Sequence, residues 1–277
     1  MPCALAALGL LVLAPLVQAA ETPFDQAFDR LYNFDFAAAH SILDSYIAGH
    51  PREPLPYAMK ASAYLFTELD RMGILAGQFF ADDKRIADKK RMAPDPRIRA
   101  SFLQAVADAQ SRANAILTRD PNDHDALFAL CITQGVTTDY MALVEKRQIA
   151  SLAPARQSNQ YAQRLLRADP TYVDAYLTTG LTEYLVGSLP FFVRWFIRFD
   201  NVTGSKEKGM ALVERVAHGG RYLKPFAKIL LSIAYLRDKQ VRQSRGLLAE
   251  LNRDYPANPL FRKELGKLDS LLGAGAN

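Results

Sequence analysis

The chain has 277 residues, and its 34 basic and 29 acidic side chains give it a formal net charge of +5. This mild excess does not by itself identify a partner. A chain of this length buries a sizeable hydrophobic core, and it contains only two cysteines, so a small disulfide-stapled fold is excluded.

The N-terminus predicts a secretory signal peptide over residues 1–20. These residues carry no charged side chain, and "ALAALGLLVLA" from Ala4 forms one apolar run. Val17 and Ala19 suit the small-residue positions of a cleavage site, so we expect cleavage near Ala19 or Ala20. The mature chain is then exported to the periplasm or beyond, keeps Cys131 as its one cysteine, and is not expected to meet nucleic acid. No later segment is expected to be apolar enough to cross a bilayer.

Apolar residues at helical spacing recur along the rest of the chain, which predicts an all-α fold. Four junctions look alike: "GHPREPLPYAMKASAYL", "RDPNDHDALFALCITQG", "ADPTYVDAYLTTGLTEYL" and "DYPANPLFRKELGKL". Each ends an amphipathic helix at a proline, and a few polar residues precede the next helix. The junction prolines are Pro51, Pro121, Pro170 and Pro256.

This pattern resembles the tetratricopeptide repeat (TPR) superfamily, whose unit pairs a W-x2-L-G-x2-Y helix with an A-x3-F helix and a closing proline. The second-helix positions of the first unit are matched by Phe36, Ala39, Leu43 and Pro51. The first-helix positions are matched by Tyr57, Ala61 and Tyr64 in the second unit and by Tyr176 and Gly180 after Pro170. The resemblance covers nearly all of the mature chain and implies a right-handed α-solenoid.

We therefore expect a single domain over residues 21–277, built from five helix pairs and a C-terminal capping helix. First helices are expected near 24–33, 55–72, 124–145, 173–187 and 223–237. Second helices are expected near 36–49, 97–119, 155–168, 206–219 and 240–254, with the cap near 258–271. The fourth pair lacks its proline, and "HGGRYLKP" from His218 is expected to make that turn with its glycines as a helix C-cap.

The extra residues fall inside the second, third and fourth pairs, as inserts over 73–96, 146–154 and 188–205. In a stacked array these turns lie along one edge, and insertions on one face often mark a binding face. The first insert holds the densest basic run, "KRIADKKR" from Lys84, which suits either a solvated helix face or contact with anionic lipid or an acidic partner.

The resemblance also implies a concave groove lined by the first helices. Counting from the Trp-like positions predicts a groove that is nearly all apolar, so either an insert covers it or a hydrophobic partner segment lies in it. The expected lining is Ala58, Ser62, Leu65, Phe66, Phe128, Ile132, Val136, Leu177, Leu181, Tyr184, Leu185, Ile229, Ile233 and Leu236.

The third insert contains "SLPFFVRWFIRFDN", which holds the single tryptophan of the chain. Its aromatics can pack on the chain itself, dock a partner, or touch a membrane surface, and all three readings stay open. With the groove positions Phe128, Ile132, Leu181 and Tyr184, this insert supplies the candidate binding residues Phe191, Phe192, Arg194, Trp195 and Arg198.

Signals of chemistry are sparse. The four histidines fall in separate units and never at metal-ligand spacing, so no metal site is predicted and surface or capping roles are expected for them. No nucleotide-binding or hydrolase motif occurs, so no cofactor is predicted. Glu183 is expected on a buried helix, where a carboxylate needs a partner, and Arg194 or Arg198 would form a structural ion pair with it.

The expected function is a non-enzymatic, exported interaction or scaffold module of the cell envelope that binds a protein partner through its groove or its insert-bearing edge. Peripheral contact with a membrane or lipid is possible. The alternative is a carrier or sensor of an apolar small molecule or lipid, and an enzyme comes third. Because fold does not fix function, the resemblance names no ligand.

Overall fold

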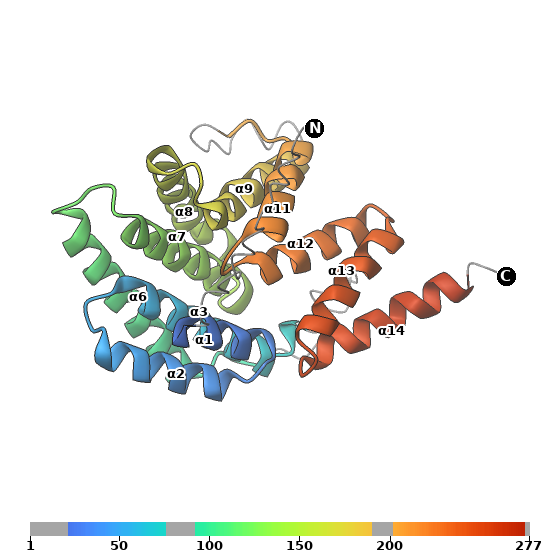
Figure 1. The fold of residues 1–277 in the computed structure, drawn as a ribbon, viewed down its shortest axis with the longest axis horizontal. Coiled ribbons are helices and arrows are strands. Elements are labelled where there is room, and N and C mark those ends of the chain that lie inside the picture. The colour runs from blue at the N-terminus through green and yellow to red at the C-terminus, as the bar shows by residue number, and fades with distance from the viewer. Residues whose placement is uncertain (1–21, 76–91, 190–201, 275–277) are drawn as a thin grey trace, which may run out of the picture.

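The computed structural model describes residues 22–75, 92–189 and 202–274, and within these residues all regular structure is helical. Eleven α-helices follow one another in sequential antiparallel packing (Figure 1). A π-helical turn, Tyr140–Val144, and a 3-10 turn, Val173–Ala175, complete the set. The predicted signal peptide, residues 1–20, lies outside the described residues.

The helices form five pairs and a closing helix, as the periodicity predicts. The pairs are α1 (Pro23–Tyr32) with α2 (Phe36–Gly49), α3 (Pro54–Arg71) with α6 (Pro96–Leu117), α7 (His124–Asp139) with α8 (Gln148–Ala168), α9 (Tyr176–Ser188) with α11 (Lys206–Gly219), and α12 (Lys224–Arg237) with α13 (Val241–Asp254). The closing helix is α14 (Pro259–Ala274).

One boundary differs clearly from expectation. Helix α8 begins at Gln148, seven residues before the predicted start at 155, so most of the predicted 146–154 insert is helical. Pro154 lies inside this helix, where a proline removes one backbone hydrogen bond. Proline is more common at a helix start, yet here it lies well inside α8.

The helix starts are fixed by short-range chemistry. Thr22 and Asp25 form a reciprocal capping box at α1, and Asp35, Asp95, Asp123 and Ser205 each accept a backbone hydrogen bond as N-caps. These side chains satisfy backbone N–H groups that the helix itself leaves free.

A repeated contact supports the internal repeat. The guanidinium of Arg112 donates to the carbonyl of Pro51 and lies 3.8 Å from the ring centre of Tyr57, whose hydroxyl donates to the same carbonyl. Arg215, Pro170 and Tyr176 reproduce this arrangement four α-helices later, with the guanidinium 4.0 Å from the ring. The third pair keeps half of it, because Arg164 donates to the Pro121 carbonyl but Leu127 replaces the tyrosine.

The junction without a proline is held by a carboxylate. Buried Asp174 accepts hydrogen bonds from the backbone N–H groups of Arg221 at 3.0 Å and Leu223 at 2.8 Å. Gly220 is the helix C-cap there, but its φ of −65° needs no glycine. Close approach requires the glycine, because an added Cβ would lie 2.9 Å from Asp174 Oδ1.

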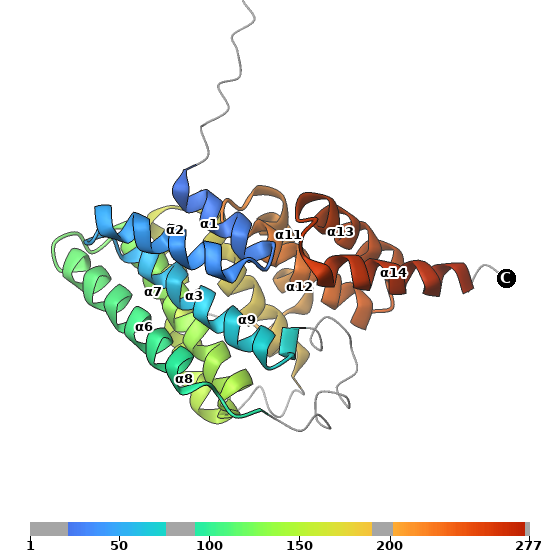
Figure 2. The same cartoon turned by 90° about the horizontal axis from the view of Figure 1, so that it is seen from below.

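The first pair touches the last units of the array. Tyr32 Oη donates to the carbonyl of Tyr222, the rings of Phe28 and Tyr222 stack at 5.0 Å, and Asn258 Nδ2 donates to the carbonyl of Tyr32 at 2.8 Å. Both views place the end of α1 beside the α13–α14 junction (Figure 1 and Figure 2). Units of an open solenoid contact only their neighbours. The packing is therefore consistent with a helical repeat, but an open solenoid is not confirmed.

The longest apolar helical stretch forms the centre of this packing. By length and composition alone, His124–Val144 is the one helical segment of the described residues that would suffice to cross a bilayer, so the expectation of no such segment is wrong on that measure. It packs against α3, α6 and α8, and Leu127, Phe128 and Leu130 are fully buried in the core. A helix enclosed by neighbours is expected to be apolar on most of its surface.

Candidate functional site

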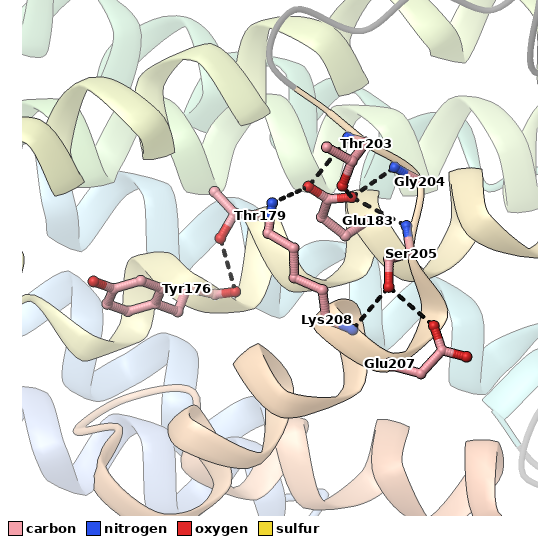
Figure 3. Close-up of polar contacts among 8 residues, drawn as sticks. All are labelled: Tyr176, Thr179, Glu183, Thr203, Gly204, Ser205, Glu207 and Lys208. Atoms are coloured by element: carbon pink, nitrogen blue, oxygen red, sulfur yellow. Dashed lines mark hydrogen bonds and ion pairs between the residues drawn. The ribbon is translucent and has the colours of Figure 1, made fainter.

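A buried carboxylate fixes the place where the chain returns from the third insert. Glu183, on α9, is 3% exposed, and its carboxylate accepts hydrogen bonds from the segment that leads into α11 (Figure 3). The backbone N–H of Gly204 donates at 2.7 Å, the hydroxyl of Thr203 at 3.0 Å, and the ammonium of Lys208 at 2.6 Å. Weaker contacts at 3.3 Å come from the backbone N–H groups of Thr203 and Ser205.

This environment keeps Glu183 ionised. Burial by itself raises the pKa of Glu183, but the ion pair with Lys208 and the hydrogen bonds from Thr203 and Ser205 outweigh it and hold the pKa below its ordinary value of 4.5. A carboxylate with a lowered pKa and engaged oxygens is a weak proton acceptor. The arrangement therefore suits a structural role.

The cation beside Glu183 is Lys208. Sequence reasoning expected Arg194 or Arg198, which both lie outside the described residues. Lys208 lies on α11, four residues after Gly204, and its side chain is half exposed. No pattern in the sequence points to this lysine, because a lysine at the start of an amphipathic helix is a common surface residue.

A second buried glutamate acts in the same way at the first insert. Glu68, on α3, is fully buried and accepts two hydrogen bonds from the guanidinium of Arg71, at 2.7 and 2.8 Å. It also accepts the backbone N–H of Asp95, the N-cap of α6, at 2.8 Å. Arg71 in turn donates to the carbonyl of Ala93. Both long inserts thus return to the fold at a buried glutamate of the preceding helix.

A small cavity lies beside Glu183, between α8, α9 and α11. Its volume is about 250 Å³, and its walls combine polar and apolar side chains. Asn159 is 2% exposed, and its Oδ1 has no hydrogen-bond partner among the described residues. The lining is Asn159, Gln163, Leu166, Tyr176, Thr179, Glu183, Val202, Lys208 and Leu212.

The predicted groove is filled at its centre. Phe128 is fully buried, with its ring 5.0 Å from that of Tyr172 and 6.3 Å from that of Tyr222. Phe24 and Phe28 of α1 contact the same Tyr222 ring. The two alternatives were coverage by an insert or occupation by a partner, yet helix α1 and the α11–α12 turn occupy this part of the groove.

The remaining groove positions lie at varied depths. Ile132, Leu181 and Tyr184 are half-buried, whereas Leu185 is 57% exposed. The candidate binding residues Phe191, Phe192, Arg194, Trp195 and Arg198 lie outside the described residues, as does the basic run from Lys84 to Arg91.

The described parts of the insert-bearing edge lie together. We define this edge as residues 92–99, 144–151, 185–189 and 202–208, where the intra-pair turns meet (Figure 2). The first two segments are joined by a 3.0 Å hydrogen bond from Arg99 Nε to Glu145. The last two are joined at Gly187, where an added Cβ would lie 2.7 Å from the backbone nitrogen of Lys206.

The histidines and the cysteine have structural contacts. His50 and His218 each contact the backbone carbonyl four residues earlier, and His124 pairs with Asp169 at 3.6 Å. His40 stacks on Tyr64 with ring centres 4.2 Å apart. Cys131 is buried, which raises its thiol pKa. No cluster of metal-ligating side chains occurs within residues 22–75, 92–189 and 202–274.

Comparison with protein-family models, with curated protein sequences and with solved structures gives no match to this chain.

Proposed function

We propose that this chain is an exported, non-enzymatic docking module of the cell envelope, built from TPR-like units, and that it holds its partner at the insert-bearing edge. The observation that carries the proposal is the pair of buried glutamates. Glu68 and Glu183 each hold the backbone where a long insert returns to the fold. A fold that places charged anchors at these points fixes where the chain re-enters the helical array after each insert.

The filled centre favours the edge over the groove. A partner segment could enter the groove only by displacing the contacts of Tyr222 with Phe28 and Phe128. The same filling weighs against the alternative of an apolar-ligand carrier. The cavity beside Glu183 is small, at about 250 Å³, and Asn159, Gln163 and Lys208 interrupt its apolar wall, which leaves little room for a lipid chain.

Exposed apolar side chains gather at the edge. Ile149 is 87% exposed, Leu185 57% and Met92 50%, and all three belong to the edge segments. Scattered exposed hydrophobics are ordinary on a protein surface, but three on one edge beside two inserts suit an interaction site. Leu271, which is 61% exposed on α14, lies elsewhere and provides a matched control.

Site-specific crosslinking tests the proposal. A photoreactive amino acid is placed singly at Ile149, Leu185 or Leu271 in the full chain, expressed in a host that exports it. We expect crosslinks to an envelope component from the two edge positions and none from Leu271. Equal crosslinking at all three positions, or none at the edge, would contradict docking through this edge.

Export is tested separately by N-terminal sequencing of the mature protein. Cleavage after Ala19 or Ala20 is expected, and a mature protein that retains Met1 would contradict it. A lipid found in native mass spectra of the purified protein, together with a loss of edge crosslinks, would instead support the carrier alternative.

A further inference from the structure

We propose that the partner at the insert-bearing edge is an anionic lipid bilayer, which the edge contacts peripherally. This inference rests on the proposed function, because it names the partner of the same surface. It is carried by the charge of the edge and by the exposure of its apolar side chains.

The described edge is cationic. It contains six basic residues and three acidic ones. The basic residues are Arg97, Arg99, Lys146, Arg147, Lys206 and Lys208, and the acidic ones are Asp95, Glu145 and Glu207. An anionic membrane attracts such a surface over a distance of roughly one Debye length, about 10 Å at moderate salt.

Internal pairing leaves much of this charge available. Arg99 and Arg147 share Glu145, and Lys208 pairs with Glu183, but Arg97 and Lys206 are exposed and form no ion pair with another described residue. These two residues lie on the starts of α6 and α11, in different edge segments. Positive charge is therefore spread across the edge, which suits a planar anionic surface.

The exposed apolar side chains stand among these cations. Ile149 lies two residues after Arg147 at the start of α8, and Leu185 lies two residues before Gly187, whose backbone packs against the backbone of Lys206. Helices α8 and α9 follow one another in the chain and pack against each other, and both line the cavity beside Glu183. Apolar side chains interspersed with Lys and Arg are typical of protein surfaces that enter the headgroup region.

The mixture of cationic and apolar side chains on the described edge favours a bilayer over a protein as its partner. A protein partner would need a complementary acidic and apolar surface, whereas an anionic bilayer offers both properties in one plane.

Vesicle flotation tests the inference. The purified mature chain is floated with vesicles of equal parts phosphatidylglycerol and phosphatidylcholine, and with vesicles of phosphatidylcholine alone. We expect binding to the first and little to the second, with loss of binding as the salt concentration is raised. Equal recovery with both vesicles, or no recovery with either, would overturn the inference.

Three variants localise the contact. Arg97→Gln and Lys206→Gln should each lower partitioning about fivefold. Ile149→Asp should lower it about tenfold by removing a buried apolar contact, whereas the matched control Leu271→Asp should bind like the wild type. Circular dichroism shows whether each variant keeps its fold. Unchanged binding by Ile149→Asp together with both charge variants would remove the edge as the membrane contact.

The outcomes separate this inference from the proposed function. Protein crosslinks at Ile149 and Leu185 without vesicle binding would overturn the lipid partner and leave the docking edge standing. Vesicle binding without any edge crosslink would overturn the edge, because the membrane contact would then lie elsewhere.

Discussion

The carboxylate of Glu183 accepts a 2.7 Å hydrogen bond from the backbone N–H of Gly204, which lies 21 residues further along the chain. Glu68 makes the corresponding bond of 2.8 Å to Asp95, 27 residues along. In both cases one buried carboxylate accepts the backbone N–H at the point where the chain returns from an insert. That hydrogen bond fixes the position of the return point.

Replacing Glu183 by glutamine should lower the free energy of unfolding by about 1–3 kcal/mol, because the amide cannot satisfy Lys208 and the backbone donors as an ionised carboxylate does. Urea denaturation measures the change. As a control, Glu207→Gln should change the free energy of unfolding little, because Glu207 is exposed and accepts a hydrogen bond from the nearby Ser205 hydroxyl. A Glu183→Gln variant as stable as the wild type would contradict the anchoring role.

The difference in stability between the wild type and Glu183→Gln should depend on pH. The pKa of folded Glu183 is held below its ordinary value of 4.5, so its contribution is fully present above that value. It is lost as the pH falls through the lowered pKa. The stability difference between wild type and Glu183→Gln should therefore be largest near neutral pH and shrink below 4.5. A difference that grows on acidification would have the wrong sign.

Tyr222 should hold the first helix pair against the later units. Truncation of its ring in Tyr222→Ala removes contacts with Phe24, Phe28 and Phe128, and should lower the free energy of unfolding by about 3 kcal/mol. Hydrogen exchange should show selective loss of amide protection in α1. Tyr32→Phe, which removes one hydrogen bond to the Tyr222 carbonyl, should lose about 1 kcal/mol. Unchanged protection of α1 in Tyr222→Ala would contradict closure by these contacts.

The repeated Arg–Tyr–Pro contact should have similar energies in its two full copies. Arg112→Ala and Arg215→Ala should each lower the free energy of unfolding by about 1 kcal/mol. Lysine should not restore it, because an ammonium cannot stack on Tyr57 or Tyr176 as a planar guanidinium does. Double-mutant cycles with Tyr57→Leu and Tyr176→Leu measure the coupling energy of each Arg–Tyr pair. A coupling energy near zero in both copies would show that the contact does not stabilise the fold.

The crossing of α9 and α11 should not tolerate a methyl group. An added Cβ at Gly209 would lie 2.5 Å from the backbone nitrogen of Tyr184 and 2.7 Å from the Gly180 carbonyl, so Gly209→Ala should destabilise by about 2–4 kcal/mol. At Gly246 of α13 nothing lies within 4 Å, so Gly246→Ala should stabilise by about 0.5–1 kcal/mol. If both variants change the free energy of unfolding equally, close packing does not explain why position 209 is a glycine.

Gly180 illustrates how far a sequence pattern can predict packing. The TPR resemblance places it at the small position of a first helix, and its Cβ would meet Leu212 at 2.9 Å. Its counterpart on α11 is Gly209, which no pattern singled out. The small position of one helix is visible in a motif, but the residue that faces it depends on how the two helices cross.

The sequence by itself determined which segments of this protein are helices and how they pair in order. The signals are local: capping side chains such as Thr22 and Asp95, prolines at the junctions, and apolar residues at helical spacing. The tertiary structure alone decided that Lys208 pairs with Glu183, that Glu68 matches it at the other insert, and that Tyr222 meets the first helix. These contacts join residues far apart in the chain, and Tyr32 and Tyr222 are 190 positions apart. Periodicity reports which face of a helix is apolar but not which distant face will cover it.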